Sequence, residues 1–158
     1  MPNNLFNAYS KQRVTRTPVL VVEDNADQWT IIQGAIKECF PEVEAIWVSD
    51  ADQALAYLEE TKTQAGQLPK LIFLDLYLPQ REDGWKLLKQ LKDPAMGFSL
   101  LPVVVLSHSS QPEDVEEAYD FWLTSYIVKP LDYDQWISAL TALRNYWWNV
   151  VTLPGPQK

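Results

Sequence analysis

Five short apolar runs, separated by longer stretches with helical periodicity, constrain the fold of this chain more than any other feature. The predicted strands are residues 19–22, 45–48, 71–74, 103–106 and 125–128. The predicted helices are residues 26–40, 50–62, 85–92, 112–122 and 132–148. Strands that are apolar at every position are buried on both faces, which a parallel sheet between two helix layers provides. The sequence therefore predicts an α/β fold, a doubly wound five-stranded parallel sheet with helices on both faces.

Polar side chains follow four of the five predicted strands. Glu23 and Asp24 follow the first strand, Asp75 the third, Ser107 the fourth and Lys129 the fifth. The carboxyl ends of parallel strands lie along one edge of the sheet, and ligands of open α/β sheets bind there. Each of these residues alone could be a helix cap or a loop residue. Their occurrence at successive strand ends favours one shared site.

This group of side chains has a chemical consequence. Three carboxylates that lie close together repel one another, unless protonation, the Lys129 ammonium or a divalent cation relieves the repulsion. Clustered carboxylate oxygens suit Mg²⁺, which keeps several waters and needs few protein ligands. An aspartate beside a cation, an ammonium and a hydroxyl can attack a phosphoryl group, because the positive charges neutralise the phosphoryl oxygens. The residues alone therefore indicate phosphoryl chemistry at Asp75.

Composition and charge exclude several classes of protein. The formal net charge is −8, which repels phosphate backbones, so a nucleic-acid partner is not expected. Cys39 is the one cysteine of the chain, and no apolar run is long enough for a membrane span or a signal peptide. We therefore expect a cytoplasmic protein without a membrane contact. Residues 1–17 are expected to form a flexible arm, residues 18–148 the domain, and residues 149–158 an apolar, then proline-rich tail.

Four motifs at the strand ends carry a resemblance to a known family. They read Val-Leu-Val-Val-Glu-Asp-Asn at residues 19–25, Leu-Asp-Leu-Tyr-Leu-Pro at residues 74–79, Val-Val-Val-Leu-Ser at residues 103–107 and Tyr-Ile-Val-Lys-Pro at residues 126–130. Together they resemble the receiver domain of two-component response regulators, over about residues 18 to 147. Within that family, the chain looks most like the small regulators associated with cyanobacterial phytochromes. The resemblance implies the strand order 2-1-3-4-5 and phosphoryl transfer from a sensor histidine kinase or a phosphotransfer protein.

The resemblance also implies a role for each site residue. Asp75 would be the phosphoacceptor, and Lys129 its ion-pair partner. Mg²⁺ would be the cofactor, held by Glu23, Asp24, Asp75 and the backbone carbonyl of Tyr77. Ser107 would supply a hydroxyl that shifts toward the phosphoryl group. Tyr126 would be the switch aromatic, the ring that changes position when that hydroxyl shifts.

Three features depart from the usual pattern of the family. The loop from Asp75 to Gly84 is one residue longer than usual, and Ser107 replaces the commoner threonine. His108 stands where a small residue is usual, next to the path by which a phosphoryl donor reaches Asp75. It is either a tolerated bulky loop residue or a side chain that restricts access, and we predict restricted access.

Two other functions were weighed against a phosphorylated switch. An unphosphorylated adaptor of the same shape would be expected to have lost the acceptor aspartate, an acidic residue or the lysine, and all of these are present. An aspartate-nucleophile phosphatase of the haloacid dehalogenase type needs a second aspartate two residues after the nucleophile, where this chain has Tyr77. We therefore do not expect an enzyme. The apolar residues from Trp148 to Leu153 exceed what one core can cover, which predicts a homodimer through the last helix and tail. The alternative is a tail that folds back over its own helix.

Overall fold

The computed structural model describes residues 16–64, 68–121 and 125–147. Its strands are β1 (Thr17–Val22), β2 (Val43–Val48), β3 (Ile72–Asp75), β4 (Val103–Ser107) and β5 (Ser125–Val128). Its helices are α1 (Ala26–Cys39), α2 (Ala51–Lys62), α3 (Arg81–Lys92), α4 (Pro112–Tyr119) and α5 (Tyr133–Trp147), together with the short 3-10 helix η2 (Pro94–Met96). Of the predicted arm and tail, the described residues include only Arg16 and Thr17.

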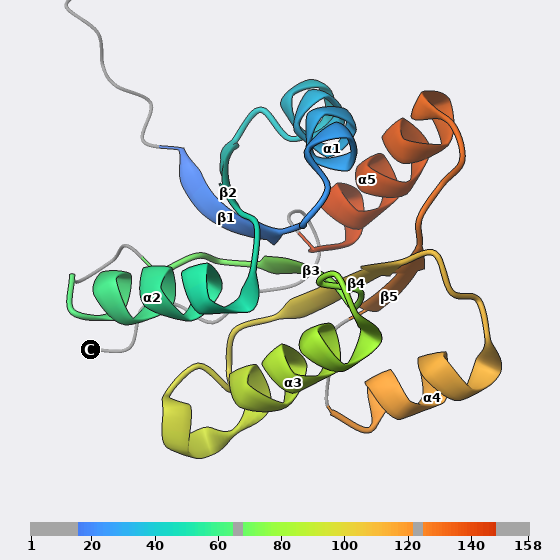
Figure 1. Cartoon of the computed structure of the whole chain (residues 1–158). Coiled ribbons are helices and arrows are strands. Elements are labelled where there is room, and N and C mark those ends of the chain that lie inside the picture. Colours follow the sequence, from blue (N-terminus) through green and yellow to red (C-terminus); the bar gives the residue numbers. More distant parts are fainter. Residues whose placement is uncertain (1–15, 65–67, 122–124, 148–158) are drawn as a thin grey trace, which may run out of the picture.

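The five strands form one sheet in the order β2-β1-β3-β4-β5. All four neighbouring pairs are parallel, with Leu20 of β1 opposite Ile72 of β3 and Phe73 of β3 opposite Val104 of β4. Helices α1 and α5 cover one face, and α2, α3 and α4 cover the other (Figure 1). The predicted fold, including the strand order implied by the family, is confirmed.

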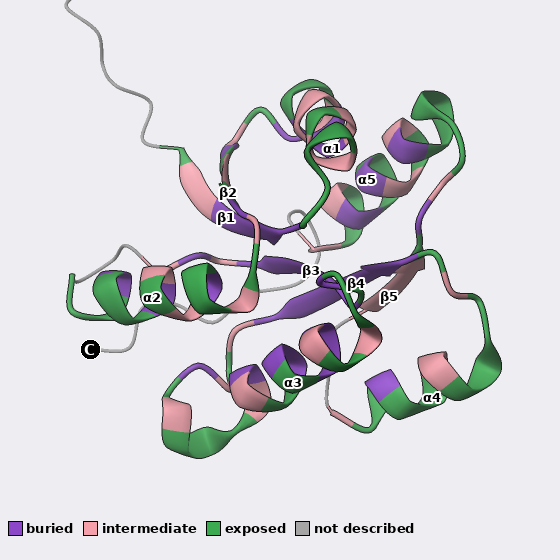
Figure 2. Cartoon of the chain, viewed as in Figure 1, coloured by how far each residue is buried: buried purple, intermediate pink, exposed green. Residues whose placement is uncertain are grey.

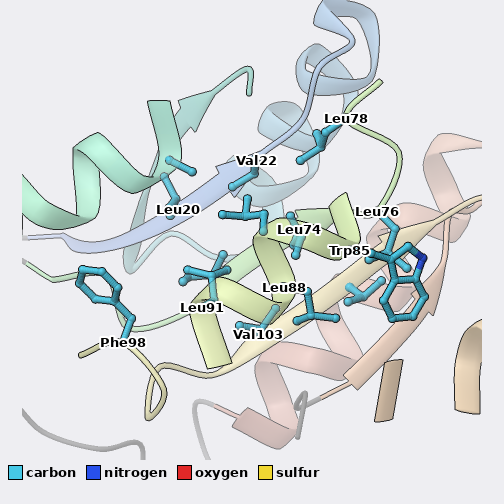
Figure 3. Close-up of a cluster of buried hydrophobic side chains, with 14 of the residues drawn as sticks. Leu20, Val22, Leu74, Leu76, Leu78, Trp85, Leu88, Leu91, Phe98 and Val103 are labelled. Carbon is cyan, nitrogen blue, oxygen red and sulfur yellow. The ribbon is translucent and has the colours of Figure 1, made fainter. Parts of the chain in front are cut away.

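Two hydrophobic cores fill the space between the sheet and its helix layers. Successive side chains of a strand point to opposite faces. Leu20 and Val22 of β1 accordingly pack with residues of α2, α3 and α4, whereas Val19 and Val21 pack with residues of α1 and α5. Figure 3 shows the first of these cores, and Figure 2 shows how burial concentrates on the central strands. Helix α5 faces the second core through an apolar stripe formed by Trp136, Leu140, Leu143 and Trp147.

The prediction of full burial holds for the inner strands and is wrong for the two edge strands. Every described residue of β3 and β4 is buried. In β2 and β5 most residues are half-buried or exposed, and Val128 of β5 is 44% exposed. An edge strand has a neighbour on one side only, so its apolar composition does not ensure burial.

Helix α3 begins at Arg81, four residues before the position that apolar periodicity predicts. The Asp83 carboxylate accepts a hydrogen bond from the backbone N–H of Gln80 at 3.3 Å, which caps the first turn. The periodic apolar residues start only at Trp85, so the polar first turn was missed. At the start of α1, the Asn25 side chain accepts hydrogen bonds from two backbone N–H groups of the first turn and so caps the helix.

Gly84 lies where α3 packs directly on the backbone that follows β3. A Cβ atom at Gly84 would lie 1.8 Å from the backbone oxygen of Leu76 and 2.2 Å from its carbonyl carbon. Since Leu76 directly follows Asp75, this contact fixes the course of the chain as it leaves the candidate site.

Among the described residues, no helix has the length and apolar character that crossing a lipid bilayer requires.

Candidate functional site

The predicted site residues lie at the carboxyl ends of the strands, as expected. Asp75 and Ser107 are the last residues of β3 and β4, Glu23 directly follows β1, and Lys129 directly follows β5. All four residues are buried, with exposed fractions of 4% or less. The burial of Glu23, Asp75 and Lys129 is unusual, because acids and lysines are almost never fully buried without a partner.

Lys129 supplies that partner for both buried acids. Its Nζ atom lies 2.7 Å from Glu23 Oε2 and 3.1 Å from Asp75 Oδ2. The backbone N–H of Lys129 donates to the carbonyl of Ser107 at 2.7 Å, which ties the β5 end to the β4 end. One ammonium thus faces two carboxylates, so the buried group keeps an excess of negative charge when both acids are ionised.

The environment of Glu23 reflects this excess. Burial raises the pKa of Glu23 to about 7, the hydrogen bond from Lys129 opposes that rise, and the charge of Asp75 adds to it. The carboxylate also accepts a bond from the backbone N–H of Asn25 at 3.2 Å. Burial disfavours the charged form of an acid, and a nearby negative charge acts in the same direction.

Asp24 completes an acidic cluster at this edge of the sheet. One carboxylate oxygen from each of Glu23, Asp24 and Asp75 lies within 4.8 Å of the other two, and Asp24 is exposed. Three clustered carboxylates, of which two are paired with the one Lys129 ammonium, are under-neutralised, and oxygen ligands of this kind fit Mg²⁺ or Mn²⁺. The donor set therefore fits a hard divalent cation.

Tyr77 contacts the cluster through its backbone, and His108 follows Ser107 in the chain. The backbone N–H of Tyr77 donates to Asp75 Oδ1 at 3.0 Å, so both oxygens of the Asp75 carboxylate are engaged. His108 itself is exposed. The use of the Tyr77 carbonyl as a ligand, and the effect of His108 on access, stay predictions.

Trp47 contacts the site from β2. Its indole N–H donates to the backbone carbonyl of Glu23 at 2.7 Å, and its ring stacks on Trp29 of α1 with centroids 5.5 Å apart. Nothing in the sequence indicates that these two tryptophans support a site residue. Trp47 is 38% exposed.

Ser107 and Tyr126 meet through a residue that sequence reasoning missed. The Ser107 hydroxyl accepts a hydrogen bond from the backbone N–H of Ser109 at 3.1 Å, and the Tyr126 hydroxyl donates to the carbonyl of Ser109 at 2.8 Å. Burial raises the pKa of Tyr126, and hydrogen bonding by Ser107 and Ser109 opposes that rise. Ser109 lies two residues after Ser107, the last residue of its motif. No pattern in the sequence indicates a role for its side chain.

Comparisons with known proteins agree with this geometry. A family model described as the response regulator receiver domain matches residues 19–141. The chain is 32% identical over 138 residues to the "Probable methanogenesis regulatory protein FilR2" of Methanothrix harundinacea, covering 87% of this chain and 88% of that protein. It is 29% identical over 138 residues to the response regulator Rcp1 of Synechocystis sp., covering 87% of this chain and 92% of Rcp1.

Solved structures give the same result. The phosphorylated cyanobacterial phytochrome response regulator RcpA superposes with a TM-score of 0.75 at 33% identity, covering 89% of this chain and 99% of RcpA. The Mn²⁺-bound form of Rcp1 gives a TM-score of 0.73 at 29% identity, covering 88% of this chain and 99% of Rcp1. With the fold, the strand-end acids and the buried lysine in place, the chain belongs to the family of response regulator receiver domains.

Proposed function

We propose that this receiver domain is a phosphorylation switch in which Asp75 accepts a phosphoryl group and the signal passes on through changed protein contacts. The observation that carries the proposal is the ion pair of Lys129 with Asp75, buried beside Glu23 and the exposed Asp24. A buried acid paired with lysine at the ligand-binding edge of an α/β sheet suits a reactive carboxylate.

The proposed reaction is a simple displacement at phosphorus. A carboxylate oxygen of Asp75 forms a bond to the phosphorus atom while the bond from phosphorus to the donor's leaving group breaks. The leaving group departs with that electron pair, as imidazole from a phosphohistidine or as acetate from acetyl phosphate. Lys129 balances charge on the phosphoryl oxygens, and the Ser107 hydroxyl donates a hydrogen bond to one of them.

A divalent cation fits this proposal. Glu23, Asp24 and Asp75 would hold Mg²⁺ through carboxylate oxygens, and Tyr77 through its backbone carbonyl. When bound, the cation would neutralise charge on the phosphoryl oxygens. Support comes from the clustering of the three carboxylates and from the Mn²⁺-bound form of the similar protein Rcp1.

The proposed donor is a sensor histidine kinase or a phosphotransfer protein, and the similarity to RcpA favours a kinase of the phytochrome type. We also propose that the protein is cytoplasmic and binds neither nucleic acid nor membrane. The net charge of −8 supports this, because it repels phosphate groups. An unphosphorylated adaptor is the alternative, and labelling of Asp75 separates the two.

Wild-type protein incubated with Mg²⁺ and acetyl phosphate is expected to gain one phosphoryl group, because Asp75 ends β3 within the acidic cluster and is paired with Lys129. Asp75→Asn should gain none, since an amide oxygen is a poor nucleophile. Asp24→Ala should need more Mg²⁺, because a charged ligand is lost. Intact-mass analysis over time measures all three.

Equal labelling of wild type and Asp75→Asn would contradict the site assignment. A wild type without any label, but with native circular dichroism, would favour the adaptor.

The same time course tests His108, for which we propose restricted access. His108→Ala should be labelled faster than wild type, and an unchanged rate would mean that the exposed imidazole leaves the route open.

We also propose that the chain forms a homodimer through α5 and the tail. Trp147 ends α5 as described, and the apolar residues after it lie outside the described residues. Deletion of residues 148–158 is expected to convert a dimer to a monomer in light scattering, because apolar contact area is lost. A wild type that is monomeric with and without beryllium fluoride would contradict the dimer, and a dimer that survives the deletion would place the interface elsewhere.

A further inference from the structure

Ser109 forms four hydrogen bonds that connect the site to α4. Its N–H donates to the Ser107 hydroxyl at 3.1 Å, and its carbonyl accepts from the Tyr126 hydroxyl at 2.8 Å. Its own hydroxyl donates to Asp114 Oδ2 at 2.5 Å and accepts from the backbone N–H of Gln111 at 3.3 Å. Asp114 lies in the first turn of α4. The short loop from β4 to α4 is therefore fixed at both ends, by the site on one side and by a carboxylate on the other.

Asp114 is itself held from a different helix. Arg81, the first residue of α3, donates to Asp114 Oδ1 through Nη2 at 2.8 Å and through Nε at 3.2 Å. The guanidinium group also contacts Glu117 at 3.0 Å and lies 4.8 Å from the ring centre of the buried Trp85. A planar guanidinium that donates two hydrogen bonds to one carboxylate and lies over an indole ring has little freedom to reorient.

These contacts keep Asp114 ionised. The hydrogen bond from Ser109 lowers the pKa of Asp114, and the bond from Arg81 lowers it further. The Asp114 side chain is 15% exposed, so its bond to Ser109 is a charge-assisted bond with limited access to water. Such bonds are shorter and stronger than bonds between neutral groups.

The bond from Ser109 also determines what the Ser107 hydroxyl can do. A serine hydroxyl has one proton to donate and two lone pairs to accept bonds. When one lone pair is occupied by the Ser109 N–H, the Ser107 proton can be donated to the neighbouring Tyr126 hydroxyl, with which Ser107 also hydrogen-bonds, or to an acceptor on the Asp75 side. A phosphoryl oxygen on Asp75 is such an acceptor, and donors that are oriented in advance contribute most to stabilising charge.

We propose that Asp114, held by Arg81, is a positioning residue that acts through Ser109 to orient the Ser107 hydroxyl before a phosphoryl group arrives. The inference rests on the proposed function, since it assigns a task within phosphoryl transfer to Asp75. If Asp114 acts in this way, its removal slows phosphorylation through Ser109 and does not change how tightly the phosphodonor binds.

The test compares acetyl phosphate labelling of Asp114→Ala with that of Glu113→Ala, a matched variant at an exposed acid in the same helical turn. Asp114→Ala should label about tenfold more slowly at saturating donor, which is the size of effect expected for one charge-assisted hydrogen bond. The donor concentration at half-maximal rate should stay unchanged. Glu113→Ala should label at the wild-type rate.

Ser109→Ala decides whether the effect passes through Ser109. This variant loses the hydroxyl that Asp114 holds and should also label slowly, and adding Asp114→Ala to it should change the rate little further. A wild-type rate in Ser109→Ala, additive effects in the double variant, or an equal loss in Glu113→Ala would each overturn the proposal. Ser109→Ala carries the test alone if Asp114→Ala fails to fold.

A second measurement separates this inference from the proposed function. Amide exchange followed by NMR in the unphosphorylated protein should be about tenfold faster at Ser109 in Asp114→Ala than in wild type, because the loop loses its anchor. Faster exchange at Ser109 in Asp114→Ala, together with a wild type that acetyl phosphate cannot label, would reject the phosphoryl function and keep the anchored loop. Unchanged exchange at Ser109 would overturn the positioning role even if Asp75 is labelled.

Discussion

Gly84→Ala is expected to lower the free energy of unfolding by more than about 4 kcal/mol. Losses of this size are exceptional and are expected where an added atom collides with backbone that cannot move aside. The added methyl group would lie 1.8 Å from the backbone oxygen of Leu76, and neither partner is a side chain that can turn aside. To relieve the collision, α3 would have to move away from the chain that follows Asp75. Urea unfolding monitored by circular dichroism measures the loss.

Gly34→Ala provides a matched control, because it makes the same chemical change inside α1. A methyl group there would contact the Tyr133 ring at 3.8 Å, an ordinary van der Waals distance. Alanine is favoured over glycine in a helix interior by up to about 1 kcal/mol, so this variant should be slightly more stable than wild type. Equal stability of Gly84→Ala and wild type would show that α3 does not pack as closely as described.

Lys129→Met is expected to lower the free energy of unfolding by about 3–5 kcal/mol in the absence of divalent cations, the usual loss when one partner of a buried ion pair is removed. Methionine fills most of the volume of the lysine stem but leaves Glu23 and Asp75 facing each other without a positive charge. For a domain of this size, the corresponding drop in melting temperature is about 10 °C. Thermal unfolding in EDTA at pH 8 is the measurement.

The pH matters, because Glu23 already has a pKa of about 7. Without the ammonium this pKa rises further, so the penalty is relieved by proton uptake at lower pH and is largest above pH 7. Asp75→Asn in the Lys129→Met background should recover part of the stability, because one of the two repelling charges is removed. Mg²⁺ should stabilise Lys129→Met more than it stabilises wild type.

Lys86→Met is the control for this series, since Lys86 is an exposed residue of α3. Its melting temperature should differ little from that of wild type, because exposed charges contribute little to stability. If Lys129→Met melted together with Lys86→Met, the buried ion pair would not be the element that holds the strand ends together.

The sequence predicted the sheet and the centre of the site for a common reason. Apolar strands and the polar residues that end them are local signals, and parallel topology then brings Glu23, Asp75 and Lys129 together without further information. The strand order came from the motifs of the family. Exposure of β2 and β5 could not be predicted, because their composition does not reveal that each has only one neighbouring strand.

The network around Ser109 lay beyond sequence reasoning for a different reason. Arg81 and Asp114 are separated by 33 positions and sit on two helices whose relative rotation is set by packing. In the sequence, Asp114 reads as an ordinary acid in the first turn of a helix, and Arg81 lies in a predicted loop. Only the folded arrangement shows that Asp114 accepts bonds from both Arg81 and Ser109.

The stacked indoles of Trp29 and Trp47 give the chain a built-in optical probe. Tryptophan emission responds to nearby charge, and the Trp47 ring nitrogen is bound to the backbone of Glu23, next to the acidic cluster. A cation or phosphoryl group that alters the field at Glu23 would shift the emission of this one indole. Trp47→Phe would then silence the change while the other six of the seven tryptophans stay in place, so occupancy of the site could be followed in real time without a label.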